Sequence, residues 1–209
     1  MYWLAGFQTK INIADFGNLK TAKTQKAIQL ALRDVVEYLK DLGVVTVVLG
    51  GSQDLSFGIS QAFKLQRFYT LSCIDSVFDV KKGTESFDSS NFLSRIFRTQ
   101  SNLFQFSLLA YQSHLVPLYL FSKTMGVGEH CRLGLLRDDI SLAEPLLRNT
   151  DFLSFDMGAL RFSEAPGTMY INPNGLHGEE ACQLAKYAGL SEKLSVFGLF
   201  GINLLKEKD

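Results

Sequence analysis

Several features that mark specialised classes of protein are missing from this 209-residue chain. The three cysteines, Cys73, Cys131 and Cys182, are an odd number at long spacings, which fits neither a disulfide framework nor a zinc site. We expect them to be buried small hydrophobic residues in a reducing compartment. No stretch approaches the roughly 18 consecutive apolar residues of a membrane span, and no basic flank precedes an apolar run at the N-terminus. These absences predict a soluble, cytoplasmic protein that does not bind a membrane.

An excess of either charge is also missing. The chain has 21 Lys and Arg residues against 21 Asp and Glu residues, and no basic run of the kind that binds nucleic acid. It contains no proline-rich or Gly/Ser-rich linker, no low-complexity segment and no internal repeat. With 46% hydrophobic residues, the chain is long enough to bury a sizeable core. We therefore expect one globular domain over residues 1–209 and no nucleic-acid partner.

Strand-like and helix-like segments alternate along the sequence. Apolar and β-branched runs predict strands at 10–17, 44–49, 68–74, 104–110, 131–135, 152–155 and 194–200. Helical spacing predicts helices at 24–42, 56–65, 92–97, 139–148 and 178–188. The continuous β-branched run at 44–49 is typical of a strand buried on both faces. This alternation predicts a three-layer α/β/α fold around a mostly parallel central sheet.

Carboxylates follow several of the predicted strands. Asp75 and Asp79 follow the strand at 68–74, and Asp156 follows the strand at 152–155. Because open α/β sheets keep their sites at the carboxyl ends of the strands, we expect these side chains to converge. Clustered carboxylates repel unless a cation lies among them, which suggests a divalent ion. The alternative is that each aspartate only accepts backbone N–H bonds in a turn or at the start of a helix.

Three short motifs resemble those of the ureohydrolases, the family of arginase, agmatinase and formimidoylglutamase. Gly-Gly-Ser-Gln-Asp-Leu-Ser at 50–56 resembles the family's Gly-Gly-Asp-His-Ser segment, and Asp-Ser-Val-Phe-Asp at 75–79 resembles Asp-Ala-His-x-Asp. Ser-Phe-Asp-Met-Gly at 154–158 is similar to Ser-Phe-Asp-x-Asp, and Ala-Pro-Gly follows at 165–167. Asn-Pro-Asn-Gly at 172–175 and the 178–182 segment resemble bacterial formimidoylglutamase-like proteins. The resemblance extends from about residue 11 to residue 203 and implies an arginase-like fold.

The resemblance also implies a metal site, because the family binds two manganese ions through four aspartates and two histidines. Asp75, Asp79 and Asp156 match three of the aspartates. Gln53 stands at the first histidine position, Val77 at the second and Gly158 at the last aspartate position. The resemblance therefore implies metal binding by Asp75, Asp79, Asp156 and Gln53. We expect Asp75 also to take part in catalysis. Since Val77 and Gly158 have no donor atoms in their side chains, we expect no two-metal site, and the alternative is a single divalent ion (Mn²⁺, Mg²⁺ or Ca²⁺).

Two further residues lie in one turn before a predicted helix. Glu180 aligns with the family glutamate that meets the cationic end of the substrate, and His177 beside it is a candidate proton shuttle. The alternatives are that Glu180 only stabilises the first turn of the helix and that His177 is an ordinary surface residue. In addition, Gly201 stands where the family usually has a glutamate. The implied ligand is a small cationic amidine or guanidino compound.

Relative to the family, the chain is expected to be shortened at both ends, and the loss of a final helix would uncover apolar sheet surface. A partner subunit could cover that surface, so we expect a homo-oligomer. The sequence favours a formimidoylglutamase-like protein with a degenerate binuclear manganese site, weakly active or inactive in hydrolysis of formimidoyl or guanidino C–N bonds. The alternative is a working formimidoylglutamase- or agmatinase-type hydrolase with a single or unusual metal site. A nucleotide-binding domain is disfavoured because no phosphate-binding glycine motif follows Gly50 and Gly51.

Overall fold

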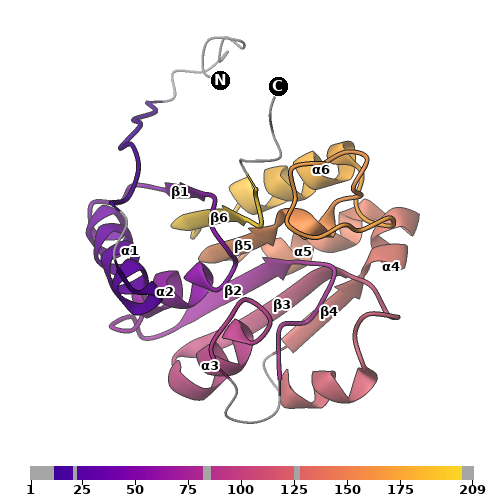
Figure 1. The fold of residues 1–209 in the computed structure, drawn as a ribbon, viewed down its shortest axis with the longest axis horizontal. Helices are drawn as coiled ribbons and strands as arrows, with labels where there is room; N and C mark the ends of the chain where they lie inside the picture. Colours follow the sequence, from indigo (N-terminus) through magenta and orange to yellow (C-terminus); the bar gives the residue numbers. More distant parts are fainter. Residues whose placement is uncertain (1–11, 21–22, 82–85, 125–127, 204–209) are drawn as a thin grey trace.

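The computed structural model describes residues 12–20, 23–81, 86–124 and 128–203, and a six-stranded sheet forms its centre (Figure 1). The strands are β1 (Thr46–Leu49), β2 (Tyr69–Ile74), β3 (Leu103–Tyr111), β4 (Gly128–Arg132), β5 (Phe152–Asp156) and β6 (Val196–Phe200). Their order across the sheet is β1-β6-β5-β2-β3-β4, and every neighbouring pair is parallel. The predicted α/β fold class is confirmed.

Helices cover both faces of this sheet. They are α1 (Gln25–Asp41), α2 (Leu55–Gln61), α3 (Phe92–Thr99), α4 (Leu133–Asp138), α5 (Ala143–Leu147) and α6 (Gly178–Gly189), with short 3₁₀ turns η1 (Leu118–Thr124), η2 (Ile140–Leu142) and η3 (Met157–Ala159). One hydrophobic core contains residues of α1, α2 and α3, and a second contains residues of α4, α5 and α6. None of the described helices is long and apolar enough to span a membrane.

The central strands supply side chains to both cores. In β2, Cys73 belongs to the core with α1–α3, and the next residue, Ile74, belongs to the core with α4–α6. Phe152 and Leu153 divide in the same way in β5. Because successive side chains of a strand point to opposite faces, a parallel strand between two helical layers needs a continuous apolar run. This explains why the central strands are predicted well.

Two predicted elements after β3 are wrong. The strand expected at 131–135 ends at Arg132, because Leu133 and Leu136, three residues apart, are buried on one side of α4. The helix expected at 139–148 is divided into η2 and α5. Pro145 lies in the first turn of α5, where a missing N–H donor is tolerated, so the proline is compatible with a new helix start.

The predictions at the beginning of the chain also differ from the structure. Of the strand expected at 10–17, residues 10 and 11 lie outside the described residues, and residues 12–17 are exposed and form no strand. The run at 44–49 does form a strand, β1, from Thr46 onward, but it is not buried on both faces. It lies at the edge of the sheet, where Val47 and Leu49 are exposed. Sequence periodicity shows a strand but not whether it has neighbours on both sides.

Two of the three cysteines are buried as expected, Cys73 in β2 and Cys131 in β4. Cys182 is exposed. It lies on α6, whose buried side consists of Ala181, Leu184 and Ala188. The spacing of these three residues leaves Cys182 on the solvent side, so the expectation that it is buried is wrong.

Candidate functional site

The predicted aspartates lie at the carboxyl ends of two adjacent central strands. Asp75 follows β2 directly, Asp79 lies four residues later, and Asp156 is the last residue of β5. All three side chains are buried. Since β2 and β5 are hydrogen-bonded neighbours with Ile74 opposite Phe155, the sheet register brings Asp75 and Asp156 to the same edge.

Burial and mutual repulsion raise the pKa values of these carboxyl groups. Burial, followed by the negative charges of Asp79 and Asp156, raises the pKa of Asp75 well above its usual value. Burial and the charge of Asp156 raise the pKa of Asp79 to about 8. Burial also raises the pKa of Asp156. At neutral pH and without a cation, the folded chain therefore favours the protonated form of Asp79.

Backbone amides occupy part of the acceptor capacity of the cluster. Val77 N donates to Asp75 Oδ1 at 3.0 Å, and Gly158 N donates to Asp156 Oδ1 at 2.6 Å, so that Asp156 caps η3. The turn and capping role that the sequence left as an alternative is therefore present.

Gln53 is buried between β1 and α2. Its Nε2 donates to Ser154 Oγ at 3.3 Å, and Ser154 Oγ is also 2.7 Å from Ser56 Oγ. Ser154 lies in β5, two residues before Asp156. The amide of Gln53 thus fixes the start of α2 against the strand that ends in Asp156.

Two glycines enclose Asp156. A Cβ atom added to Gly158 would lie 2.8 Å from Asp156 Oδ1, and one added to Gly201 would lie 2.6 Å from the same oxygen. Gly201 also has a φ of +75°, a conformation that L side chains rarely adopt. The same Gly158 Cβ would be 3.6 Å from Tyr170 Cδ2. At both positions, the Asp156 side chain occupies the space that a Cβ atom would need.

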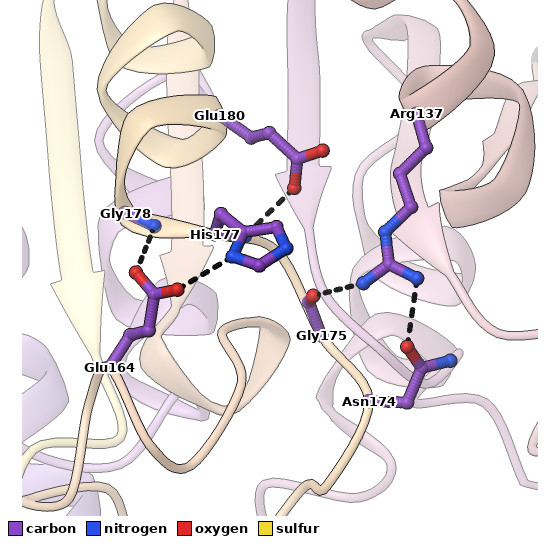
Figure 2. A network of polar contacts seen from close by, with 7 residues as sticks. All are labelled: Arg137, Glu164, Asn174, Gly175, His177, Gly178 and Glu180. Carbon is purple, nitrogen blue, oxygen red and sulfur yellow. Dashed lines mark hydrogen bonds and ion pairs between the residues drawn. The ribbon is translucent and has the colours of Figure 1, made fainter.

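His177 and Glu180 form a separate network with Glu164, as Figure 2 shows. His177 Nδ1 lies 2.6 Å from Glu164 Oε1, and Glu180 Oε2 accepts a 2.7 Å hydrogen bond from the backbone N–H of His177. Glu164 Oε2 also accepts from Gly178 N at 2.6 Å. The hydrogen bond from Gly178 N, followed by the one with the His177 side chain, lowers the pKa of Glu164. Within the described part of the chain, the side-chain bonds of His177 and Glu180 lead to this turn and not to the aspartates.

Residues that the sequence analysis missed hold the other side of the same turn. Arg137 Nη1 donates to Asn174 Oδ1 at 2.9 Å, and its Nη2 donates to Gly175 O at 2.6 Å (Figure 2). Gln112 Nε2 donates to Asn174 O. No sequence pattern pointed to Arg137, because it falls after a segment expected to be a strand. The turn at 172–177 is therefore fixed from α4, from the end of β3 and from the 164 loop.

The sequence predicts metal ligands among these aspartates. Among the described residues, no group of three or more His, Cys, Asp or Glu side chains is arranged to hold a metal ion. Val77 and Gly158 offer no side-chain donors, and Gly158 is packed against Asp156. The structure brings the three aspartates into electrostatic contact, although the described residues do not group them as a set that could hold a metal ion.

Comparisons with known proteins agree on the fold. The sequence model of the Arginase family matches residues 2–199. A structure of Trypanosoma cruzi formiminoglutamase with Mn²⁺ superposes with a TM-score of 0.81 at 22% identity, covering 90% of this chain and 67% of that one. Agmatine ureohydrolase of Thermoplasma volcanium gives 0.76 at 18% identity, covering 94% and 67%. Formimidoylglutamase from Bacillus subtilis gives 0.76 at 18% identity, covering 89% and 62%. No curated protein matches the sequence.

Proposed function

Because the chain belongs to the arginase family, we propose that it is a formimidoylglutamase-like protein whose binuclear manganese site is degenerate. It would be weakly active or inactive in hydrolysis of formimidoyl and guanidino C–N bonds. The observation that carries this proposal is the set of replaced ligand positions, Gln53, Val77 and Gly158, combined with the close packing of Gly158 and Gly201 on Asp156. This chain spans about two thirds of the length of the solved relatives, whose activities are their own.

The chemical consequence concerns the nucleophile. In this family's reaction, paired metal ions supply hydroxide at neutral pH. Asp75 and Asp79 can instead share a proton, since a side-chain hydrogen bond joins them. A protonated carboxyl pair is a weak base, so it does not replace the hydroxide. The remaining groups can position a small ligand, but they do not generate a strong nucleophile.

We propose that the turn presenting Glu180 binds a cationic amidine or guanidino compound. Glu180 uses Oε2 to accept from His177 N, which orients its carboxylate at the start of α6. The turn beneath it is held by Arg137 and Gln112, so the carboxylate is presented from a fixed backbone. A carboxylate held in this way matches the planar donors of a guanidinium or amidinium group.

Metal content is the decisive measurement. The purified protein would be incubated with excess Mn²⁺, separated from free ions and analysed by mass spectrometry for metal per chain. The control is T. cruzi formiminoglutamase, which has been crystallised with Mn²⁺. We expect fewer than two ions per chain, together with little or no release of formamide or ammonia from N-formimidoyl-glutamate. Two ions per chain would refute the proposal.

A second candidate function rests on the retention and burial of Asp75, Asp79 and Asp156 together. It is a working hydrolase that uses one metal ion. One ion per chain, with hydrolysis of N-formimidoyl-glutamate, arginine or agmatine that Asp75→Asn abolishes, would establish this alternative. Zero ions per chain would eliminate it.

A further inference from the structure

The guanidinium group of Arg161 has no hydrogen-bond partner among the described residues. Arg161 follows the end of β5 and the η3 turn, and its Nε is shielded from solvent without a partner. Buried polar groups of folded proteins are nearly always hydrogen-bonded, and a guanidinium group has five N–H donors. A shielded and unbonded Nε–H therefore indicates that an acceptor is supplied from outside this part of the chain.

The neighbouring carboxylate of Glu164 is bonded to other groups. The hydrogen bonds from Gly178 and His177, and then the charge of Arg161, lower the pKa of Glu164, so the two charged groups are close enough to interact. However, Glu164 Oε1 lies 2.6 Å from His177 Nδ1, and Glu164 Oε2 accepts from Gly178 N at 2.6 Å (Figure 2). The charge of Arg161 is therefore partly balanced, but its donors are not used.

Arg161 and Glu180 flank the same short piece of backbone. Arg161 N donates to Leu176 O at 3.0 Å, and the next residue, His177, donates its N–H to Glu180 Oε2 at 2.7 Å. A Cβ atom at Gly175 would lie 2.4 Å from Arg161 N, so the glycine lets the two segments approach. The unpaired cation and the carboxylate that we assign to the amidine thus lie on the two sides of one turn.

An unpartnered acceptor lies at this turn as well. Gln112 is 3% exposed, and its Nε2 donates to Asn174 O, whereas its Oε1 has no partner in the part of the chain that the structure describes. Because Asn174 O can only accept, this bond fixes which end of the amide faces the turn. The surroundings of the turn thus lack an acceptor for Arg161 and a donor for Gln112. A ligand with both an anionic group and N–H groups supplies both.

We propose that Arg161 is a specificity-determining residue that binds a carboxylate of the ligand, so that the site selects amidino or guanidino compounds that carry a carboxylate. This inference rests on the proposed function, because it assumes that Glu180 meets the cationic end. Of the donors of Arg161, only Nε is both shielded and unbonded, so the two Nη groups are accessible to a ligand. A guanidinium group can bind a carboxylate through two parallel N–H···O bonds. A ligand without a carboxylate leaves these donors unpaired and binds less tightly.

L-Arginine and agmatine are the probes, because they share the guanidino group and differ by the carboxylate. Their binding to the metal-free protein would be measured by isothermal titration calorimetry in a chelator-containing buffer. We expect arginine to bind at least about tenfold more tightly than agmatine. Agmatine has the larger positive charge, so an acidic site without a carboxylate-binding cation would show the opposite preference.

Variants of Arg161 test the residue itself. Arg161→Met removes the guanidinium group and should weaken arginine binding at least about tenfold while leaving agmatine binding unchanged. Arg161→Lys keeps the charge without the forked geometry, so it should recover part of the preference. Arg148→Met is the matched control, because it removes an exposed guanidinium group that is paired with Glu144, and it should keep the wild-type preference. Thermal unfolding of each variant would show that it is folded.

Glu180→Gln separates this inference from the proposed function. It should weaken the binding of both probes alike, because it removes the charge that meets their shared cationic end. A wild-type chain that binds neither probe would overturn the proposed ligand class and the role of Arg161 together. Equal affinities for the two probes in the wild type, or an equal loss of both in Arg161→Met, would overturn the role of Arg161 and leave the ligand class in place.

Discussion

The buried aspartates should make the metal-free protein less stable as the pH rises from 5 to 7. Asp79 has an ordinary pKa of 3.8 and a pKa of about 8 in the folded chain. Between these values the folded state binds more protons than the unfolded state, so the free energy of unfolding falls as the pH increases. The stabilising proton is fully held below about pH 4, and its contribution is lost by about pH 8.

The size of this change in the free energy of unfolding follows from the one additional proton that Asp79 binds in the folded state. A difference of one bound proton changes the free energy of unfolding by about 1.4 kcal/mol per pH unit, so the interval from pH 5 to pH 7 costs at most about 3 kcal/mol. For a chain of this length, roughly 2–4 °C of melting temperature accompanies each kcal/mol. We therefore expect Tm to fall by about 5–10 °C, and the raised pKa of Asp75 acts in the same direction.

Differential scanning calorimetry in a chelator-containing buffer series would measure this change. Asp79→Asn keeps the shape of the side chain without its titration, so it should flatten the slope and raise Tm at pH 7. Asp138→Asn changes an exposed aspartate on α4 and should retain the wild-type slope. A Tm that is constant or rises between pH 5 and 7 in the wild-type chain would refute the reasoning.

Three further changes have defined outcomes. Gly158→Asp restores a family ligand type but forces a Cβ to 2.8 Å from Asp156 Oδ1, so urea denaturation should show a loss of about 1–3 kcal/mol, without added Mn²⁺ binding. In His177→Ala, Glu164 loses a hydrogen-bond partner that lowers its pKa, so NMR titration of its carboxyl carbon should show a higher pKa than in the wild type. Asp54→Ala removes a buried acceptor between α1 and α2 and should reduce the free energy of unfolding by about 2–3 kcal/mol.

Matched controls are available for these variants. Gly189→Ala adds a Cβ in α6 that meets nothing within 4 Å, so it should not destabilise the chain, in contrast to Gly158→Asp. For Asp54, the conservative variant Asp54→Asn keeps an oxygen that can accept from Gln25 and Gln29, so it should lose less stability than Asp54→Ala. An Asp54→Ala chain as stable as the wild type would show that this buried network contributes nothing. Tight Mn²⁺ binding by Gly158→Asp would show that the backbone around Asp156 can open.

The central sheet was predictable because its strands are buried on both faces and are therefore apolar throughout. The runs at 68–74 and 152–155 must be apolar on both sides to separate two helical cores, and this requirement is visible in the sequence. The convergence of Asp75 and Asp156 follows from parallel strand direction alone. The edge position of β1 was not predictable, because a β-branched run shows a preference for strand but not the number of neighbours.

The local closure of the site was equally hidden from the sequence. Gly158 indicates a missing carboxylate, but the sequence does not show that the Asp156 side chain fills the space where a Cβ at Gly158 or Gly201 would lie. The support given by Arg137 to Gly175 depends on α4 beginning at Leu133, which the strand prediction for 131–135 obscured. Such contacts join segments that are far apart in the chain, so residue spacing along the sequence does not predict them.

The placement of β1 has a consequence for how the chain folds. Its sheet partner is β6, with Thr46 opposite Val196, so the first strand among the described residues pairs with the last one. Until β6 leaves the ribosome, Val47 and Leu49 have no sheet to join, although α1 and α2 can already pack together. Pairing between strands so far apart in the sequence is slow, because the long intervening segment must be closed into a loop before the strand contacts can stabilise it. During synthesis, β1 therefore stays without its sheet partner until β6 has emerged.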